Sequence, residues 1–309
     1  MEPAMEPATL RVRLPDINSA EEEICRTNAR FIEMFLNQNV HKNRYEVTCV
    51  HVNDNSNGSF LMVTLGTETF HFREPLKLKL ATIVAFVLHF GHVEKYTGGT
   101  TDDFGEEAIS VLNSRGPYSI REFSGDMTSY TKAVFQHTFG PVITSIKFIS
   151  NGGEPLDYRF IIEKYAMTHV YRWELRNVSS FDAVYLLINK WIREDAVVGT
   201  SALIAIRERI NQFQESMVRG GRAIHEIPNI AVVISTNHPG KYILLTRPLA
   251  HVYELEMHVA EQAIRLINDI RRKEFTICLN SLPMDSQEKL RRLLGDFETD
   301  VTNRANNNS

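Results

Sequence analysis

The 309-residue chain has few cysteines, no long apolar run and no large excess of either charge. Cys25, Cys49 and Cys278 are far apart and odd in number, which excludes a disulfide framework, and no Cys-x-x-Cys pair is present for a structural zinc site. The most apolar stretch, residues 80–90, is too short to cross a bilayer. The acidic N-terminus lacks the apolar core of a secretory signal. We therefore expect an intracellular protein, cytoplasmic or nuclear, without membrane contact.

The net charge of −4 argues against nucleic acid as a partner. A nucleic-acid-binding protein usually presents a basic face that neutralises phosphates. Here Glu208 and Glu215 lie among the arginines of residues 207–222, and Glu226 follows them. We therefore expect a solvated face of mixed charge there, and no nucleic-acid partner.

No catalytic motif occurs, neither a Gly-x-Ser-x-Gly elbow nor a His-Glu-x-x-His zinc motif. His89 and His92 could bind a metal together on a helix, but Gly91 between them favours a turn and no third ligand stands nearby. The glycines of residues 96–103 favour a plain polar loop over a phosphate loop, because no Lys-Ser/Thr follows them. Spacing does not order the titratable residues that an enzyme would use, among them His137, Asp182, His225, Glu226 and His238. We expect no catalytic residue, metal or cofactor, and an enzyme of unknown class remains the alternative.

The first third of the chain has the pattern of a helix followed by antiparallel strands. Residues 19–36 favour a helix, with Ser19 as its cap and Phe31, Ile32 and Phe35 on one face. Alternating strand patterns follow, and an Asn-Gly pair predicts a hairpin between the first two; the strands span residues 45–52, 60–65 and 67–72. Residues 76–88 fit two short strands or one buried helix, because periodicity does not decide between them.

Three strand-then-helix units are predicted between residues 119 and 195. Their strand centres, Ile120, Ile146 and Trp173, lie roughly 26 residues apart, a spacing typical of stacked βα repeats. Helices are expected at residues 104–113, 128–137, 157–167 and 180–193. The last helix has a capping pair, Ser179 and Asp182, and its two sides differ in polarity. The apolar stripe is Val184, Leu187, Ile188, Trp191 and Ile192, and the polar side is Asn189, Lys190 and Arg193.

These patterns predict an α/β fold, a leucine-rich-repeat-like stack of βα units with an N-terminal antiparallel region and a C-terminal β cap. Residues 202–210 fit a strand or a helix, and short strands of the cap are expected at residues 222–227, 230–235, 242–247 and 252–257. Helices are expected at residues 260–272 and 286–297. The predicted domains are a disordered arm (1–18), an N-terminal region (19–104), the βα-repeat domain (105–260), C-terminal helices (261–298) and a disordered tail (299–309).

One face of the predicted repeat sheet is polar. In the third strand Arg172, Glu174 and Arg176 alternate with apolar residues that include Trp173, so they point away from the buried face. The candidate partner-binding residues are Arg121, Lys147, Arg172, Glu174 and Arg176. The alternative, that these side chains only solvate an exposed sheet face, stays open. Trp173 and Trp191 are expected in the core.

Residues 178–193 (VSSFDAVYLLINKWIR), 213–221 (FQESMVRGG) and 225–228 (HEIP), followed by strands to residue 258, resemble the nematode F-box-associated domain over residues 105–260. The resemblance implies a non-catalytic, substrate-recognising adaptor related to ubiquitin-ligase F-box proteins. The F-box itself is not recognisable. Residues 11–15 (RVRLP) are similar to its start, but residues 19–39 do not carry the rest. We expect a protein partner. This chain has no recognisable segment that would bind the adaptor subunit of a cullin ligase, so that subunit is a doubtful partner.

Overall fold

The computed structural model describes residues 29–41, 43–55, 58–73, 77–100, 105–150, 156–164, 170–207, 223–227, 231–247 and 253–261. The chain forms two compact units, unit 1 ending at Ile143 and unit 2 beginning at Thr144. The first predicted strand–helix unit therefore belongs to unit 1 and the other two to unit 2. The predicted arm and tail lie outside the described residues. The two predicted C-terminal helices also lie outside the described residues, except for residues 260 and 261. These two residues belong to a strand that ends at Glu261 and not to a helix.

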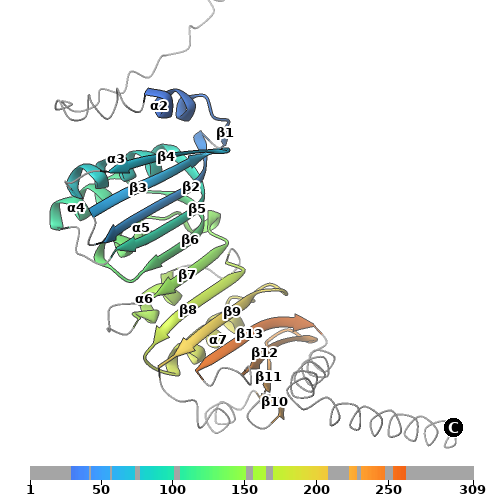
Figure 1. The fold of residues 1–309 in the computed structure, drawn as a ribbon. Coiled ribbons are helices and arrows are strands. Elements are labelled where there is room, and N and C mark those ends of the chain that lie inside the picture. Colours follow the sequence, from blue (N-terminus) through green and yellow to red (C-terminus); the bar gives the residue numbers. More distant parts are fainter. Residues whose placement is uncertain are drawn as a thin grey trace, which may run out of the picture. The chain divides into compact units, whose positions relative to one another are not determined.

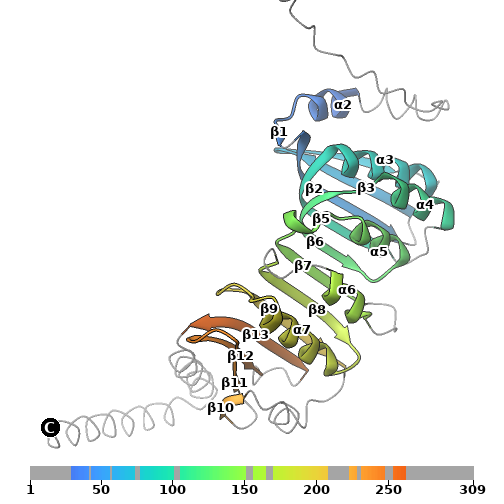
Figure 2. The ribbon, with the colours of Figure 1, turned by 180° about the vertical axis from the view of Figure 1, so that it is seen from behind.

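Unit 1 is a sheet with helices on one of its faces. Its elements are α2 (Ala29–Leu36), β1 (Val40–His41), β2 (Arg44–Asn55), β3 (Gly58–Leu65), β4 (Glu68–Arg73), α3 (Lys77–Phe90), β5 (Gly91–Thr100), α4 (Glu106–Arg115), β6 (Ser119–Asp126), α5 (Ser129–Gln136) and the 3-10 turn η1 (Gly140–Val142). The strands β2, β3 and β4 form an antiparallel meander, and β1 pairs with β2. On the other side of β2, β5 and then β6 add in parallel. Figures 1 and 2 show α3, α4 and α5 on the same face of these strands.

The structure confirms the N-terminal hairpin and resolves one open alternative. β2 and β3 pair antiparallel, with a register that runs from Cys49 opposite Thr64 to Asn55 opposite Gly58. Residues 77–90 form one helix, α3, whose buried residues share one side while further apolar residues, among them Leu78, Ile83 and Phe86, lie on the others. Such a helix has no clear amphipathic period, which is why the sequence pattern does not separate it from strands.

The predicted polar loop at residues 96–103 is wrong over its first half. β5 continues to Thr100, and Tyr96 is fully buried, with its ring stacked 5.0 Å from that of Phe123. Residue 98 of the strand is a glycine because a side chain would not fit there. A Cβ atom at this position would lie 2.9 Å from the Tyr96 hydroxyl oxygen. The glycine therefore reports close packing and not a flexible loop.

Helix α2 is docked on unit 1 by an aromatic cluster. Phe31 and Phe35 are buried, as the apolar pattern predicts. The ring of Phe31 makes edge contacts with those of Phe70 and Phe72, at 5.3 and 5.1 Å between centroids. The Phe35 ring lies 5.0 Å from that of Tyr45. Aromatic pairs at these distances stabilise packing beyond their buried area, so α2 is an integral part of unit 1.

Unit 2 continues the alternation of strands and helices and then becomes antiparallel. Its elements are β7 (Ser145–Ile149), α6 (Tyr158–Lys164), β8 (Arg172–Val178), α7 (Asp182–Arg193), β9 (Ser201–Ile206), β10 (Ala223–Ile227), β11 (Ala231–Ser235), β12 (Lys241–Thr246) and β13 (Glu254–Glu261). The strands β7, β8 and β9 are parallel neighbours. β13 pairs antiparallel with β9, and β12, β11 and β10 follow in order. The chain is thus an α/β protein whose central strands are parallel.

The strands predicted as a C-terminal cap form, but they are not a separate layer. Through β13 they extend the same sheet outward from β9. Residues 201–206 are a strand, which settles the second open alternative. Sequence patterns identify these strands but not their neighbours, because β9 and β13 are separated by the three other strands in the chain.

Helix α7 packs on the sheet through the predicted apolar stripe, with two corrections. Val184, Leu187, Ile188, Trp191 and Ile192 are all buried. Lys190, predicted on the polar side, is buried too; its Nζ lies 3.1 Å from Oε1 of Glu194, one turn further on. The long lysine stem buries apolar atoms while its amine reaches a carboxylate. The predicted cap is also shifted, because the Ser180 hydroxyl, not Ser179, accepts from the Asp182 N–H at 3.1 Å.

Candidate functional site

One face of the unit 2 sheet is polar, and the other packs against α6 and α7. Along β8, Trp173 and Leu175 are buried while Arg172 and Glu174 are not, and β7, β9 and β13 alternate in the same way. Figure 1 looks onto the strands and Figure 2 onto the helices that cover them. We call the uncovered side of these four strands the open face. Its residues are Ser145, Lys147, Arg172, Glu174, Arg176, Ser201, Leu203, Glu254, Glu256 and His258.

Strand register arranges the open face in rows that cross the sheet. Residues paired across neighbouring strands stand side by side on one face. The first row is Ser145, Arg172, Ser201 and His258, and the second is Lys147, Glu174, Leu203 and Glu256. A groove of about 370 Å³ runs over both rows. The first row offers hydrogen-bond donors, and the second mixes both charges around one leucine.

Glu174 is the centre of an ion-pair network on this face. Its Oε1 accepts from Lys147 Nζ at 2.9 Å and from Arg176 Nε at 2.6 Å, and Arg176 also lies 3.6 Å from Glu254. Partial burial raises the pKa of Glu174, whereas the hydrogen bonds and charges of Lys147 and Arg176 lower it. The lowering is larger than the effect of burial, so the pKa lies below its ordinary value. The same hydrogen bond from Glu174 raises the pKa of Arg176. Three of the predicted residues therefore neutralise one another.

Two charges of the groove are not neutralised in this way. Arg172 is exposed, and no carboxylate pairs with it among the residues that the structure describes. Glu256 approaches only the imidazole of His258, at 3.9 Å, beyond hydrogen-bond distance, within that same part of the chain. Among the described residues, the groove thus combines a satisfied network with a cation, Arg172, that has no carboxylate partner and an anion, Glu256, that has only the distant imidazole of His258.

The structure brings together four of the five predicted residues. Lys147, Arg172, Glu174 and Arg176 share the open face, whereas Arg121 lies on β6 of unit 1, where its guanidinium pairs with Glu94 at 3.0 Å. The sequence-based reasoning missed the contribution of β9 and β13, including Leu203, Glu256 and His258. Alternation in residues 254–259 marks that strand, but nothing local shows that it lies beside β9.

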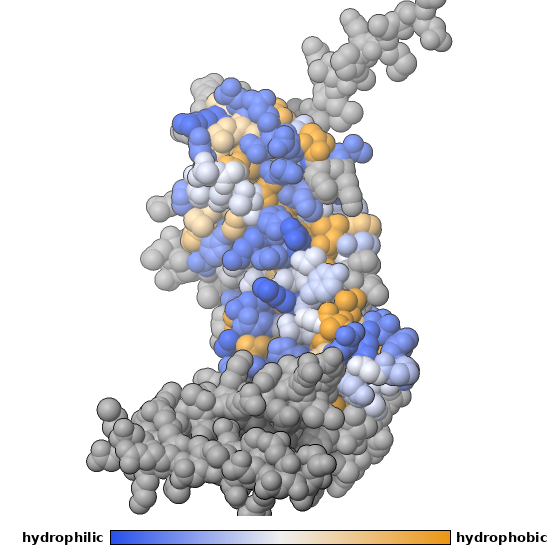
Figure 3. All heavy atoms as spheres, turned by 90° about the vertical axis from the view of Figure 1, so that its right-hand side faces the viewer, coloured by the Kyte–Doolittle hydropathy of each residue, from blue (hydrophilic) through white to orange (hydrophobic). Residues whose placement is uncertain are grey.

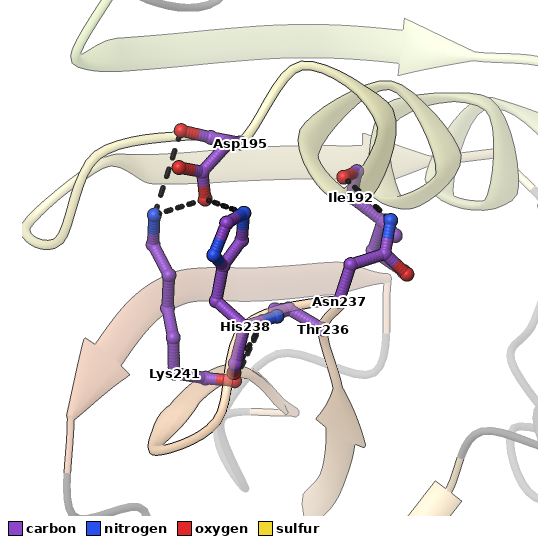
Figure 4. Close-up of polar contacts among 6 residues, drawn as sticks. All are labelled: Ile192, Asp195, Thr236, Asn237, His238 and Lys241. Carbon is purple, nitrogen blue, oxygen red and sulfur yellow. Dashed lines mark hydrogen bonds and ion pairs between the residues drawn. The ribbon is translucent and has the colours of Figure 1, made fainter.

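A second polar cluster holds the β11–β12 turn against the end of α7 (Figure 4). Asp195 accepts a hydrogen bond from Lys241, and its Oδ1 lies 3.4 Å from Nε2 of His238. The Lys241 hydrogen bond lowers the pKa of Asp195. The Asn237 side chain donates to the carbonyl of Ile192 at 3.4 Å, where the last turn of a helix leaves carbonyls unpaired. These contacts fix a turn that the sequence marks by Asn, Pro and Gly.

The predicted catalytic alternatives do not form a site in the described part of the chain. His137 follows α5 in unit 1, while Asp182 begins α7 and His238 lies in the β11–β12 turn of unit 2. The side chains of His225 and Glu226 are outside the description. His89 and His92 turn to different partners, the carbonyl of Arg115 at 2.6 Å and the hydroxyl of Ser119 at 2.7 Å.

The described residues contain no group of three His, Cys, Asp or Glu side chains placed to hold a metal ion. Among their helices, none combines the length and the apolar character that a membrane span requires. On the side of the molecule drawn in Figure 3, apolar residues form small separate groups among hydrophilic ones. The described residues on that side therefore do not form a broad apolar patch of the kind that binds proteins.

No protein-family model matches the chain, and neither does any curated protein or any solved structure.

Proposed function

We propose that the chain is a non-catalytic protein-interaction module that docks a protein partner on the open face of unit 2. The observation that carries the proposal is the groove over β7, β8, β9 and β13, in which exposed charges of both signs surround a half-buried leucine. Charged groups held at fixed spacing on a sheet favour a partner with the complementary pattern and disfavour others. Helices α6 and α7 support the strands from behind, so the side chains are presented on a rigid element.

In this proposal the βα units from β7 to β9 act as a short leucine-rich-repeat-like stack that presents its strand face to the partner. The resemblance to the nematode F-box-associated domain supports a substrate-recognition role related to ubiquitin-ligase F-box proteins, inside the cell. Helix α2 bears on the coupling to a ligase. Since Phe31 and Phe35 dock it on unit 1, it does not stand apart as an F-box would. Any direct contact with a ligase adaptor subunit would use other residues.

The test compares partners that co-purify with the tagged full chain and with two charge-reversal variants. Arg172→Glu reverses the free cation of the groove without breaking an ion pair of the described network. Arg121→Glu is the matched control, because Arg121 is also an exposed strand arginine but belongs to unit 1. We expect a stoichiometric protein partner that is lost with Arg172→Glu and kept with Arg121→Glu. Equal recovery by both variants, or no stoichiometric protein with the unmodified chain, would contradict the proposal.

A further inference from the structure

We propose that the segment bound in the groove is an extended polypeptide that carries an acidic and a basic residue four positions apart. This inference rests on the proposed docking function and adds the chemistry of the partner. It follows from which charges of the open face are already paired, which are not, and how far apart the register places them.

The acidic residue is assigned to the first row of the groove. Arg172 offers a guanidinium that no carboxylate of the described residues occupies, and its row neighbours Ser145 and Ser201 provide hydroxyl groups. A guanidinium binds a carboxylate through two parallel N–H···O bonds, and hydroxyls can complete the oxygen's hydrogen bonding. Lys147 does not compete for this role, because its amine is held by Glu174 at 2.9 Å.

The basic residue is assigned to Glu256 at the other end of the groove. Glu174 is satisfied by Lys147 and Arg176, whereas Glu256 has only the distant imidazole of His258. A lysine or arginine of the partner would meet an available carboxylate there. Leu203 pairs with Glu256 across β9 and β13 and is half-buried. An apolar residue of the partner, between its two charges, would cover this leucine.

The register sets the spacing of the two charges. Arg172 and Glu256 are separated by two strand-to-strand steps, from β8 through β9 to β13, and by one pair of residues along the strand. Strands lie roughly 4.8 Å apart and two residues span roughly 6.8 Å, so the two Cα atoms are about 12 Å apart. An extended chain advances about 3.3 Å per residue, so about 12 Å corresponds to three or four residues. Because successive side chains of an extended chain point to opposite faces, only residues four positions apart both face the groove.

The occupant is a polypeptide segment because the groove is open and lies across several strands. Its two free charges have opposite sign and are too far apart for a single carboxylate or phosphate to bridge. A segment that crosses the strands can meet both charges and the leucine at once. A helix would repeat its side chains every 5.4 Å along its axis and would place residues three or four apart too close together.

The test measures binding of fluorescein-labelled peptides of mixed Ser, Thr and Val background to the purified full chain by fluorescence anisotropy. Each peptide carries one Asp and one Lys, separated by one to six positions, in both orders. We expect the tightest binding at a separation of four and weaker binding at three and five, where the two side chains point to opposite faces. Arg172→Glu should weaken that peptide about tenfold, in line with the loss of a charge-assisted pair. It should restore binding when the peptide Asp is replaced by Lys. Arg121→Glu is the control, and circular dichroism and thermal unfolding check the fold of both variants.

Three results would overturn the inference: no peptide binds, affinity does not depend on the separation, or Arg172→Glu leaves it unchanged. The docking function can stand or fall separately. If Arg172→Glu abolishes the cellular partner but no spacing preference exists, the docking function holds and the charge pattern is wrong. If neither the partner nor the peptides respond to Arg172→Glu, both are wrong.

Discussion

Replacing Phe35 by alanine should destabilise unit 1, because this ring joins α2 to the sheet. The side chain is 1% exposed and lies 5.0 Å from the ring of Tyr45 and 5.8 Å from that of Phe86. An aromatic side chain buries roughly 150–250 Å². At about 25 cal/mol per Å², that area corresponds to about 4–6 kcal/mol as an upper bound. Phe-to-Ala replacements in cores cost about 3–5 kcal/mol. We therefore expect about 3–4 kcal/mol for Phe35→Ala.

Hydrogen exchange followed by mass spectrometry measures this loss where it should occur. Amides of β2, β3 and β4 that exchange only through unfolding of unit 1 should exchange at least a hundredfold faster, since about 1.4 kcal/mol is a factor of ten. Leu36→Ala is the matched control, because Leu36 is 54% exposed and its neighbour on the same helix carries the contacts. That change should stay within about 0.5 kcal/mol. If α2 were a free-standing helical module, Phe35→Ala would leave exchange in β2–β4 as it is in the unmodified protein. That result would refute the packing argument.

Three more substitutions test local features. Glu174→Gln should make the free energy of unfolding depend less on pH on the acid side. The pKa of Glu174 in the folded state lies below its ordinary value of 4.5, so the carboxylate stabilises unit 2 above pH 4.5. That contribution is lost as the pH falls through the folded-state pKa. Urea unfolding between pH 3 and 7 checks it, and equal slopes for both proteins would be the wrong outcome. Asp195→Asn keeps a residue type that tolerates the φ of 54° but removes the ion pairs with Lys241 and His238. The turn amides of His238 and Lys241, which donate to the Thr236 hydroxyl and to the His238 carbonyl, should then exchange faster, with unchanged exchange as the contrary result. Thr128→Ala should cost about 1 kcal/mol, because its hydroxyl caps α5 by accepting from the Thr131 N–H at 3.2 Å. Thr128→Ser, which keeps the hydroxyl, is its control, and a similar cost for both would speak against the cap.

Local sequence patterns predict the elements of this protein well where one short stretch decides the outcome. The Asn-Gly pair at residues 57 and 58 predicts a hairpin, and β2 and β3 do pair antiparallel there, with Asn55 opposite Gly58. The stripe from Val184 to Ile192 identifies α7 because burial repeats with the helical period. Alternation in residues 172–176 assigns Arg172 and Glu174 to a common face, because burial in a strand repeats every second residue.

What the sequence does not predict depends on partners that lie far away along the chain. The groove needs Leu203 and Glu256 beside Arg172 and Glu174, and that follows from the pairing of β13 with β9. The sequence also does not show that Arg121 belongs to a different compact unit from the other candidates. Lys190 is buried because Glu194 receives its amine, so a charged residue occupies a position that polarity alone assigns to solvent.

Photo-crosslinking from the groove tests the central claim most directly, namely that the open face of unit 2 binds a protein partner. A photoreactive amino acid is placed at Leu203 in the middle of the groove, and the control carries it at Glu122, an exposed position on β6 of unit 1. On irradiation in cells, the account predicts one dominant protein adduct from position 203 and none from position 122. No adduct from position 203, or the same adducts from both positions, would contradict it.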